Sequence, residues 1–121
     1  MSGKVVINLT TGHEDAEKVT LAFLVATAAL EHRRPVMMFT TKEAVRLGLP
    51  GYADAIVIPE APPVSRLFGQ FRDWGGELVL CPICVSSRRL DESALIAPAR
   101  IGGATALWDW IGDEPATVFS Y

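Results

Sequence analysis

Short apolar runs alternate with segments of helical periodicity along the chain, and this alternation restricts the fold more than any other feature of the sequence. The runs have the length of strands that are buried on both faces, as in a parallel sheet. Strands are predicted at Lys4–Thr10, Pro35–Thr41, Ala55–Ile58, Glu77–Leu80, Ala99–Gly102 and Ala116–Ser120. Helices are predicted at 15–31, Lys42–Leu47, Val64–Trp74, Pro82–Arg89 and Thr105–Ile111, and Asp91 opens another short one. The alternation predicts right-handed crossovers and a mostly parallel sheet with helices on both faces.

The length and composition are those of one globular domain, residues 1–121, with a genuine hydrophobic core. The apolar fraction of 50% excludes a disordered chain. The net charge is −3 and the basic residues are scattered, so we expect no nucleic-acid partner. No secretory signal precedes Val5, and the apolar stretch Leu21–Leu30 is too short to span a bilayer. We therefore expect a cytoplasmic protein without a membrane partner.

The first predicted helix has a start signal and two apolar stripes. Thr11 and Glu14 have the T-x-x-E spacing of a capping box. One stripe at helical spacing packs on the sheet, and a second covers the remaining surface. The first consists of Val19, Phe23, Ala26 and Leu30, and the second of Leu21, Leu24, Val25 and Ala28. Because an apolar helix surface must be covered on both sides, the second stripe predicts a homo-oligomer.

The only two cysteines stand in the sequence Cys81-Pro82-Ile83-Cys84, directly after the predicted strand Glu77–Leu80. Proline suits the first turn of a helix, so Cys81 is predicted at or near the N-cap. A sulfur there faces the positive end of the helix dipole, which stabilises the thiolate. We therefore expect Cys81 to be the more reactive thiol and Cys84, one turn into the helix, to be near enough to act as a resolving partner.

Other interpretations of the cysteine pair are structural. Two partly apolar thiols near a strand end can simply fill space in the core. A zinc site needs about four ligands, and the sequence offers only this pair with His13 and His32, so no metal is expected. A static disulfide is not expected in the cytoplasm, where thiols are kept reduced.

Polar residues follow each of the main predicted strands. Thr11, Gly12 and His13 follow the first strand, Thr41 and Lys42 follow the second, and Cys81 and Pro82 follow what we take to be the central one. The carboxyl ends of parallel strands meet at one edge of a sheet, which predicts a shared pocket there. His13 as a solvated loop residue and Lys42 as an ordinary surface cation are the simpler alternatives.

Two common enzyme classes lack their motifs. The first turn has one glycine and no phosphate-binding glycine pattern, and Glu14, Asp15 and Glu17 would repel a phosphate from the helix that follows. No G-x-S-x-G elbow of a serine hydrolase is present. No cofactor is therefore expected.

Several segments together resemble the DsrE/DsrF-like family, which includes the TusD-like sulfur-relay proteins. They are the opening strand and turn 4–15 with its Ala-rich helix, the strand and cysteine 77–81, the segment 88–92, the turn 102–105 and the edge strand 117–119. The resemblance implies a three-layer α/β/α sandwich with a mostly parallel, about five-stranded sheet, assembled into trimers or hexamers. It also implies a persulfide-carrying cysteine at Cys81, with sulfur donor and acceptor proteins as partners. Cys84 departs from a carrier with a single cysteine.

Three functions are consistent with these features. In a sulfur carrier, Cys81 accepts a sulfane sulfur and passes it to an acceptor thiol, and Cys84 releases it by forming a disulfide. In a thiol-disulfide redox protein, the C-x-x-C pair itself cycles between thiol and disulfide. In a non-catalytic, oligomeric module for small ligands, both cysteines serve packing and have ordinary reactivity.

Overall fold

Five parallel strands form one sheet in the order β4-β3-β2-β1-β5 in the computed structural model, which describes residues 3–121. The strands are β1 (Lys4–Leu9), β2 (Val36–Thr40), β3 (Glu77–Leu80), β4 (Ala99–Ile101) and β5 (Ala116–Ser120). The α-helices are α1 (Ala16–Glu31), α2 (Val64–Asp73), α3 (Pro82–Ser87) and α4 (Ala104–Ile111). Short 3-10 helices lie at η1 (His13–Asp15), η2 (Lys42–Gly48), η3 (Tyr52–Ala55) and η4 (Glu92–Ala94).

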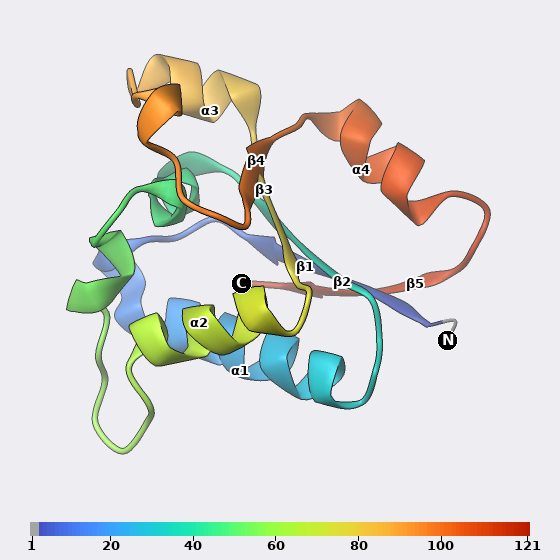
Figure 1. Cartoon of the computed structure of the whole chain (residues 1–121), viewed down its shortest axis with the longest axis horizontal. Coiled ribbons are helices and arrows are strands. Elements are labelled where there is room, and N and C mark those ends of the chain that lie inside the picture. The colour runs from blue at the N-terminus through green and yellow to red at the C-terminus, as the bar shows by residue number, and fades with distance from the viewer. Residues whose placement is uncertain (1–2) are drawn as a thin grey trace.

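The helices cover both faces of the sheet, which makes the fold a three-layer α/β/α sandwich, as the sequence predicts. Figure 1 shows α1 and α2 side by side on one face, with α3 and α4 on the other. Parallel pairing sets Ile7 of β1 against Met38 of β2 and Phe119 of β5. The carboxyl ends of β1, β2 and β3 therefore lie along one edge, where the turns that carry the predicted site residues begin.

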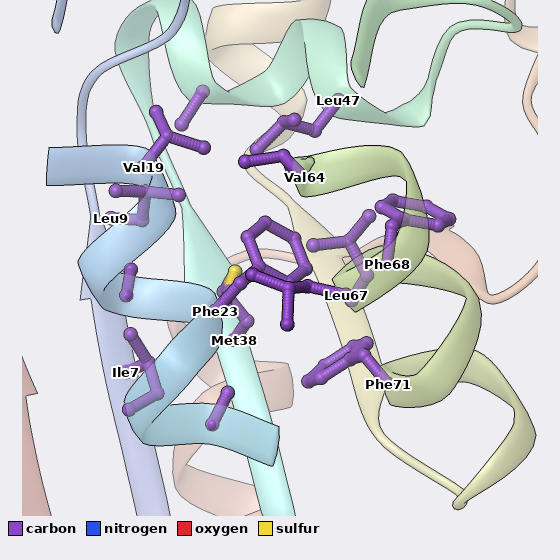
Figure 2. Close-up of a cluster of buried hydrophobic side chains, with 14 of the residues drawn as sticks. Ile7, Leu9, Val19, Phe23, Met38, Leu47, Val64, Leu67, Phe68 and Phe71 are labelled. Atoms are coloured by element: carbon purple, nitrogen blue, oxygen red, sulfur yellow. The ribbon is translucent and has the colours of Figure 1, made fainter. Parts of the chain in front are cut away.

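The main hydrophobic core lies between the sheet and the helix pair α1–α2. Figure 2 shows Phe23 of α1 among side chains of α2 and of the sheet. Its ring centroid lies 5.6 Å from that of Phe71, in an edge-to-face arrangement, and 5.8 Å from that of Phe68. In the inward stripe predicted for the first helix, Val19, Phe23 and Ala26 are fully buried, and Leu30 is partly buried against the same core. Close packing in this core makes the sheet a rigid support for the turns at its carboxyl edge.

Contacts at the opposite end of the sheet hold α4. The Lys4 ammonium donates hydrogen bonds to the Trp110 and Ile111 carbonyls at 2.5 and 3.0 Å, which satisfies free carbonyls at the end of this helix. The Trp110 indole N–H donates to Glu77 at 2.7 Å. Trp108, two residues earlier, is 69% exposed, so the two tryptophans point to different sides of α4.

Grooves lie on both sides of the edge strand β5. One, of about 660 Å³, lies beside α1 and includes Val25, Ala28 and Phe119. The other, of about 390 Å³, lies beside α4 and includes Trp108 and Val118. None of the residues that the sequence places in a pocket at the carboxyl edge lines either groove.

The structure corrects three local predictions. Asp15, not Thr11, caps α1, because η1 intervenes and the Asp15 carboxylate accepts from the Lys18 N–H at 3.0 Å. Ala55–Ile58 is not a strand, since η3 ends at Ala55 and only Ile56 is buried in the core. The strand before Cys81 is not central: β3 is second from the edge, and β2 occupies the middle.

None of the helices between residues 3 and 121 combines the length and apolar character that a membrane crossing needs.

Candidate functional site

Cys81 is fixed at the end of β3 by the backbone of the neighbouring strand. Its N–H donates to the Thr40 carbonyl at 3.0 Å. The Thr40 side chain is fully buried, and its hydroxyl donates to the Val79 carbonyl at 2.8 Å. These bonds tie the last residues of β2 and β3 together, so the cysteine leaves the sheet at a defined point.

Helix α3 begins immediately after this point, with Pro82 in its first turn and Cys81 as its N-cap residue, as the sequence predicts. The Cys81 carbonyl accepts the Val85 N–H at 3.0 Å, the first hydrogen bond of the helix. Cys81 is partly buried, whereas Pro82 is exposed and Ile83 is 78% exposed. A second protein therefore has access to this turn. The Cys81 thiol is shielded from water on part of its surface.

Cys84 lies one turn into α3 and faces the turn after β2. The Lys42 backbone N–H donates to its sulfur, with a distance of 3.1 Å from N to Sγ. Both cysteines are free thiols and both are partly buried. Lys42, an expected member of the pocket, thus contacts the cysteine pair through its backbone, while its side chain is exposed.

The surroundings of Cys81 favour the thiolate. Partial burial raises the pKa of the Cys81 thiol, but hydrogen bonds oppose it and outweigh it. They come from the backbone and side chain of Cys84 and from the backbone of Ile83, and the positive charge of Arg88 adds to them. The net result is a Cys81 pKa below its ordinary value, as expected for a nucleophilic thiol at the start of a helix.

A carboxylate on η2 controls the position of Arg88. Glu43 accepts from the Arg88 guanidinium at 2.5 Å and from Arg46 at 2.7 Å. These two hydrogen bonds hold the pKa of the Glu43 carboxyl below its ordinary value. Arg88 also donates to the Cys84 carbonyl at 3.4 Å. Through the Lys42 N–H and the Glu43 carboxylate, η2 therefore contacts both Cys84 and Arg88.

The turn after β1 has its own set of contacts. The His13 ring stacks on Tyr52 with centroids 3.6 Å apart and an interplanar angle of 4°. The His13 backbone N–H donates to the Tyr52 hydroxyl at 2.8 Å, and Nε2 lies 2.8 Å from the Tyr52 carbonyl oxygen. A Cβ atom on Gly12 would stand 2.2 Å from the Tyr52 hydroxyl, so any larger residue there would force the contacts of this turn to shift. His13 is therefore paired with Tyr52 of η3 and not with either cysteine.

The predicted site residues thus separate into two groups. The structure brings Lys42 and Cys84 together, and Pro82 approaches the turn before α4, where a Cβ on Gly103 would stand 3.7 Å from the proline ring. Gly12 and His13 belong to the Tyr52 group, and the buried Thr11 hydroxyl has no hydrogen-bond partner among the described residues. The Thr41 N–H continues the sheet by donating to the Leu9 carbonyl at 3.1 Å.

Sequence reasoning missed Glu43 and Tyr52. Glu43 follows Lys42 in the same turn after a strand. The reasoning that placed Lys42 at the carboxyl edge of the sheet therefore applied to Glu43 as well. Tyr52 had no signal, because it lies in a short 3-10 helix far from any strand end.

Chemically, the cysteine turn supplies a nucleophile. It has a partly accessible sulfur with a lowered pKa, and a second free thiol lies one turn along the same helix. Between residues 3 and 121, no cluster of three or more histidine, cysteine or acidic residues is arranged to hold a metal ion.

Comparisons with known proteins give a consistent fold and family. The structure is similar to the ychN protein of E. coli, with a TM-score of 0.79 and 20% identity over 100% of both chains. It is also similar to MTH1491 of Methanobacterium thermoautotrophicum, a protein of unknown function, with a TM-score of 0.66 and 9% identity over 99% of this chain and 100% of that one. These two likenesses concern the fold.

In sequence, 106 residues are 26% identical to the uncharacterised protein MJ0760 of Methanocaldococcus jannaschii. The match covers 88% of this chain and 38% of that relative, so the chain spans well under half of its length. The model of the DsrE/DsrF-like family matches residues 3–119, nearly the whole described chain. The chain belongs to the DsrE/DsrF-like family.

Proposed function

We propose that the chain is a cysteine-based sulfur carrier in which Cys81 holds a persulfide. One observation carries the proposal: the Cys81 thiol stands at the end of β3 and the start of α3, partly accessible, with its pKa lowered by the hydrogen bonds around it. Membership of the DsrE/DsrF-like family suggests a role in sulfur relay and supports this choice. Such a thiol must stay reduced between transfers, which is consistent with the cytoplasm.

The transfer needs no external oxidant. The Cys81 thiolate attacks the terminal sulfur of a donor persulfide, R–S–SH, and forms a new S–S bond. The S–S bond of the donor breaks, and the electron pair leaves with the donor thiolate, R–S⁻. An acceptor thiolate then attacks the outer sulfur of the Cys81 persulfide and releases the Cys81 thiolate. A low thiol pKa helps both steps, because Cys81 is the attacking anion in the first and the leaving group in the second.

Intact-protein mass spectrometry tests the proposal after incubation with a small-molecule persulfide donor. We expect the mass to increase by one sulfur atom, which treatment with a reductant removes. Cys81→Ser should abolish the increase, and Cys84→Ser should retain it. Absence of the added sulfur in the unmodified chain, or equal loading of the Cys81→Ser variant, would reject the carrier function.

The placement of two free thiols one turn apart, Cys81 at the N-cap of α3 and Cys84 within it, favours a thiol-disulfide redox protein as a second candidate. Here the Cys81 thiolate attacks a substrate disulfide and releases one substrate thiolate. The Cys84 thiol then loses its proton and attacks the Cys81 sulfur of the mixed disulfide, which breaks its S–S bond to the substrate and releases the second substrate thiolate. The substrate is reduced and the cysteine pair is oxidised. If the chain is isolated without reductant and its mass is two hydrogen atoms below that of the dithiol form, this function is favoured.

We also propose that the chain assembles into homo-oligomers, either trimers or hexamers. Its other proposed partners are a sulfur donor protein and a sulfur acceptor protein. In the outward stripe of α1, Leu21 is 43% exposed and Ala28 is exposed. On the neighbouring edge strand, Val118 is 58% exposed and Phe119 is 38% exposed. Burial of such surface in an assembly is favourable. Light scattering at micromolar concentration should give a multiple of the chain mass, and a monomer mass would reject the assembly.

A further inference from the structure

The two edges of the sheet are protected unequally against pairing with another strand. The β4 edge is three residues long and has the exposed Arg100 at its centre, paired with Glu77. The β5 edge is five residues long, and no charged residue lies between Ala116 and Ser120. Short length and charged side chains are devices by which natural sheets block association through their edges. Both devices are present at β4 and absent from β5.

Every second residue of β5 directs its backbone groups to the outside of the sheet. Just after the strand, Tyr121 donates its N–H to the Asn8 carbonyl at 2.8 Å and accepts the Thr10 N–H at 3.1 Å. Successive residues of a strand alternate their backbone groups between the two sides, so Val118 and Ser120 direct theirs away from β1. Within residues 3–121, no strand lies on that side of β5. The edge therefore has hydrogen-bond donors and acceptors to offer to a further strand.

The exposed side chains of β5 are apolar on both faces of the sheet. Val118 lines the groove of about 390 Å³ beside α4, together with the exposed Trp108. Phe119 lines the groove of about 660 Å³ beside α1, together with Thr117. A strand added at this edge would bring its own side chains next to both grooves. The same partner would thus gain backbone hydrogen bonds and apolar contacts.

We propose that β5 pairs with β5 of a second copy of the chain, antiparallel and around a two-fold axis at Val118. The two five-stranded sheets then become continuous. The inference goes beyond the sulfur chemistry and rests on the homo-oligomer of the proposed function. Because Val118 directs both backbone groups outward, the two copies of this residue exchange two N–H···O=C hydrogen bonds across the axis.

A second copy is the partner that this edge fits, because the edge is complementary to itself. Around the proposed axis, Thr117 faces Phe119 of the partner subunit, and an aromatic residue opposite a β-branched one is a favourable pair. Ala116 faces Ser120 of the partner subunit, and Val118 faces its own copy. Each chain has a net charge of −3, yet no charged residues meet in this contact, so two copies approach here without repulsion.

The pairing also selects between the two proposed assemblies. A two-fold contact joins only two copies, and of the trimer and the hexamer only a hexamer of two stacked trimers contains such contacts. The cysteine turn stays accessible in this arrangement. Cys81 follows β3, which is three strands away from β5 and therefore about 14 Å from the contact. Sulfur donor and acceptor proteins can thus reach Cys81 in the paired form.

Light scattering at micromolar concentration tests the pairing with two matched lysine variants. Val118→Lys puts a charge at the axis, opposite the same charge of the second copy, and should halve the mass of the assembly. Val57→Lys is the control, because Val57 is 57% exposed, against 58% for Val118, and lies between η3 and α2. This control should have the wild-type mass. If Val118→Lys leaves the mass of an oligomeric wild type unchanged, the pairing is rejected.

A cross-link tests the position of the axis and leaves the contact intact. Opposite residues of an antiparallel hydrogen-bonded pair have Cα atoms about 5.5 Å apart, which is within the range of a disulfide. In a chain with both native cysteines changed to serine, Val118→Cys should therefore give a covalent dimer on a non-reducing gel after mild oxidation. Val57→Cys in the same background should stay monomeric on that gel. Equal yields from the two variants, or no dimer from Val118→Cys, would overturn the two-fold pairing.

Neither measurement requires a sulfur donor, so the pairing and the carrier function can fail separately. If Val118→Lys halves the mass but wild type loads no sulfur, the pairing stands and the carrier function fails. If wild type loads sulfur as an oligomer whose mass Val118→Lys does not change, the carrier and the oligomer stand and the pairing fails. A monomeric wild type would reject the homo-oligomer and the pairing together.

Discussion

The turns after β1 and β3 open on the same edge of the sheet, yet they use their polar groups in opposite ways. In the first turn, His13 stacks on Tyr52 and both of its polar contacts go to that residue. In the turn after β3, the Cys81 thiol is partly exposed and its pKa is lowered. A place at the carboxyl edge of a parallel sheet is therefore not enough for a functional role. The hydrogen bonds must also leave a reactive group available.

The largest expected effect is on stability, at the tightly packed first turn. In Gly12→Ala, the new Cβ would lie 2.2 Å from the Tyr52 hydroxyl and 3.0 Å from the Glu43 carbonyl. We expect a loss of about 2–3 kcal/mol in the free energy of unfolding, as for an overpacked site. Gly103→Ala is the control, because its Cβ meets the Pro82 ring at an ordinary 3.7 Å. Urea unfolding measures both, and equal losses would show that the two turns are packed alike.

A smaller effect is expected from Tyr52→Phe. This change removes the hydroxyl that accepts the His13 N–H at 2.8 Å but keeps the ring that stacks on His13. We expect a loss of about 1 kcal/mol in the free energy of unfolding. The alkylation rate of Cys81 should not change, because the two turns are separate units. A changed rate would mean that the Tyr52 group and the cysteine turn are coupled.

The smallest effect concerns pH and the Glu43 ion pairs. The folded pKa of Glu43 lies below its ordinary value of 4.5, so its stabilising contribution is present above that pH and is lost as pH falls through the folded pKa. Because the carboxylate is more than one-third exposed, we expect only about 0.5 kcal/mol. Glu43→Gln should therefore lose stability at neutral pH and approach wild type as the pH falls below 4.5 and through the folded pKa.

Asp54→Asn, at an exposed carboxylate of η3, is the control for a general charge effect. The measurement is urea unfolding at a series of pH values. A constant difference between wild type and Glu43→Gln at every pH would show that the ion pairs with Arg88 and Arg46 do not contribute through the charge of Glu43.

Most of the fold could be predicted because each main element has its own local pattern. Glu77–Leu80 and Ala116–Ser120 are strands with the predicted bounds, and the long helix starts within one residue of its expected position. Strand order had no local signal, and β3 proved to be next to the edge strand β4. The prediction of a strand at Ala55–Ile58 was wrong. In this apolar run only Ile56 is buried in the core, directly after the end of a 3-10 helix.

The site could be predicted only where chemistry and local structure coincide. A cysteine followed by proline after a strand predicts an N-cap thiol, and the structure has Cys81 there. The partners of that turn could not be predicted, because they come from distant segments. Glu43 is 45 residues from Arg88, and Tyr52 is 39 residues from His13. Such pairings depend on how the turns meet at the sheet edge, which no local pattern encodes.

The most direct test of the central claim, that the turn after β3 makes Cys81 the reactive thiol, is the order in which the two cysteines are alkylated. Iodoacetamide at neutral pH, with each cysteine peptide followed by mass spectrometry, should label Cys81 well before Cys84. The lowered Cys81 pKa and the engagement of the Cys84 sulfur by the Lys42 N–H both predict this order. Equal, slow labelling of both cysteines would contradict it and would make the pair part of the packing of a binding or structural module.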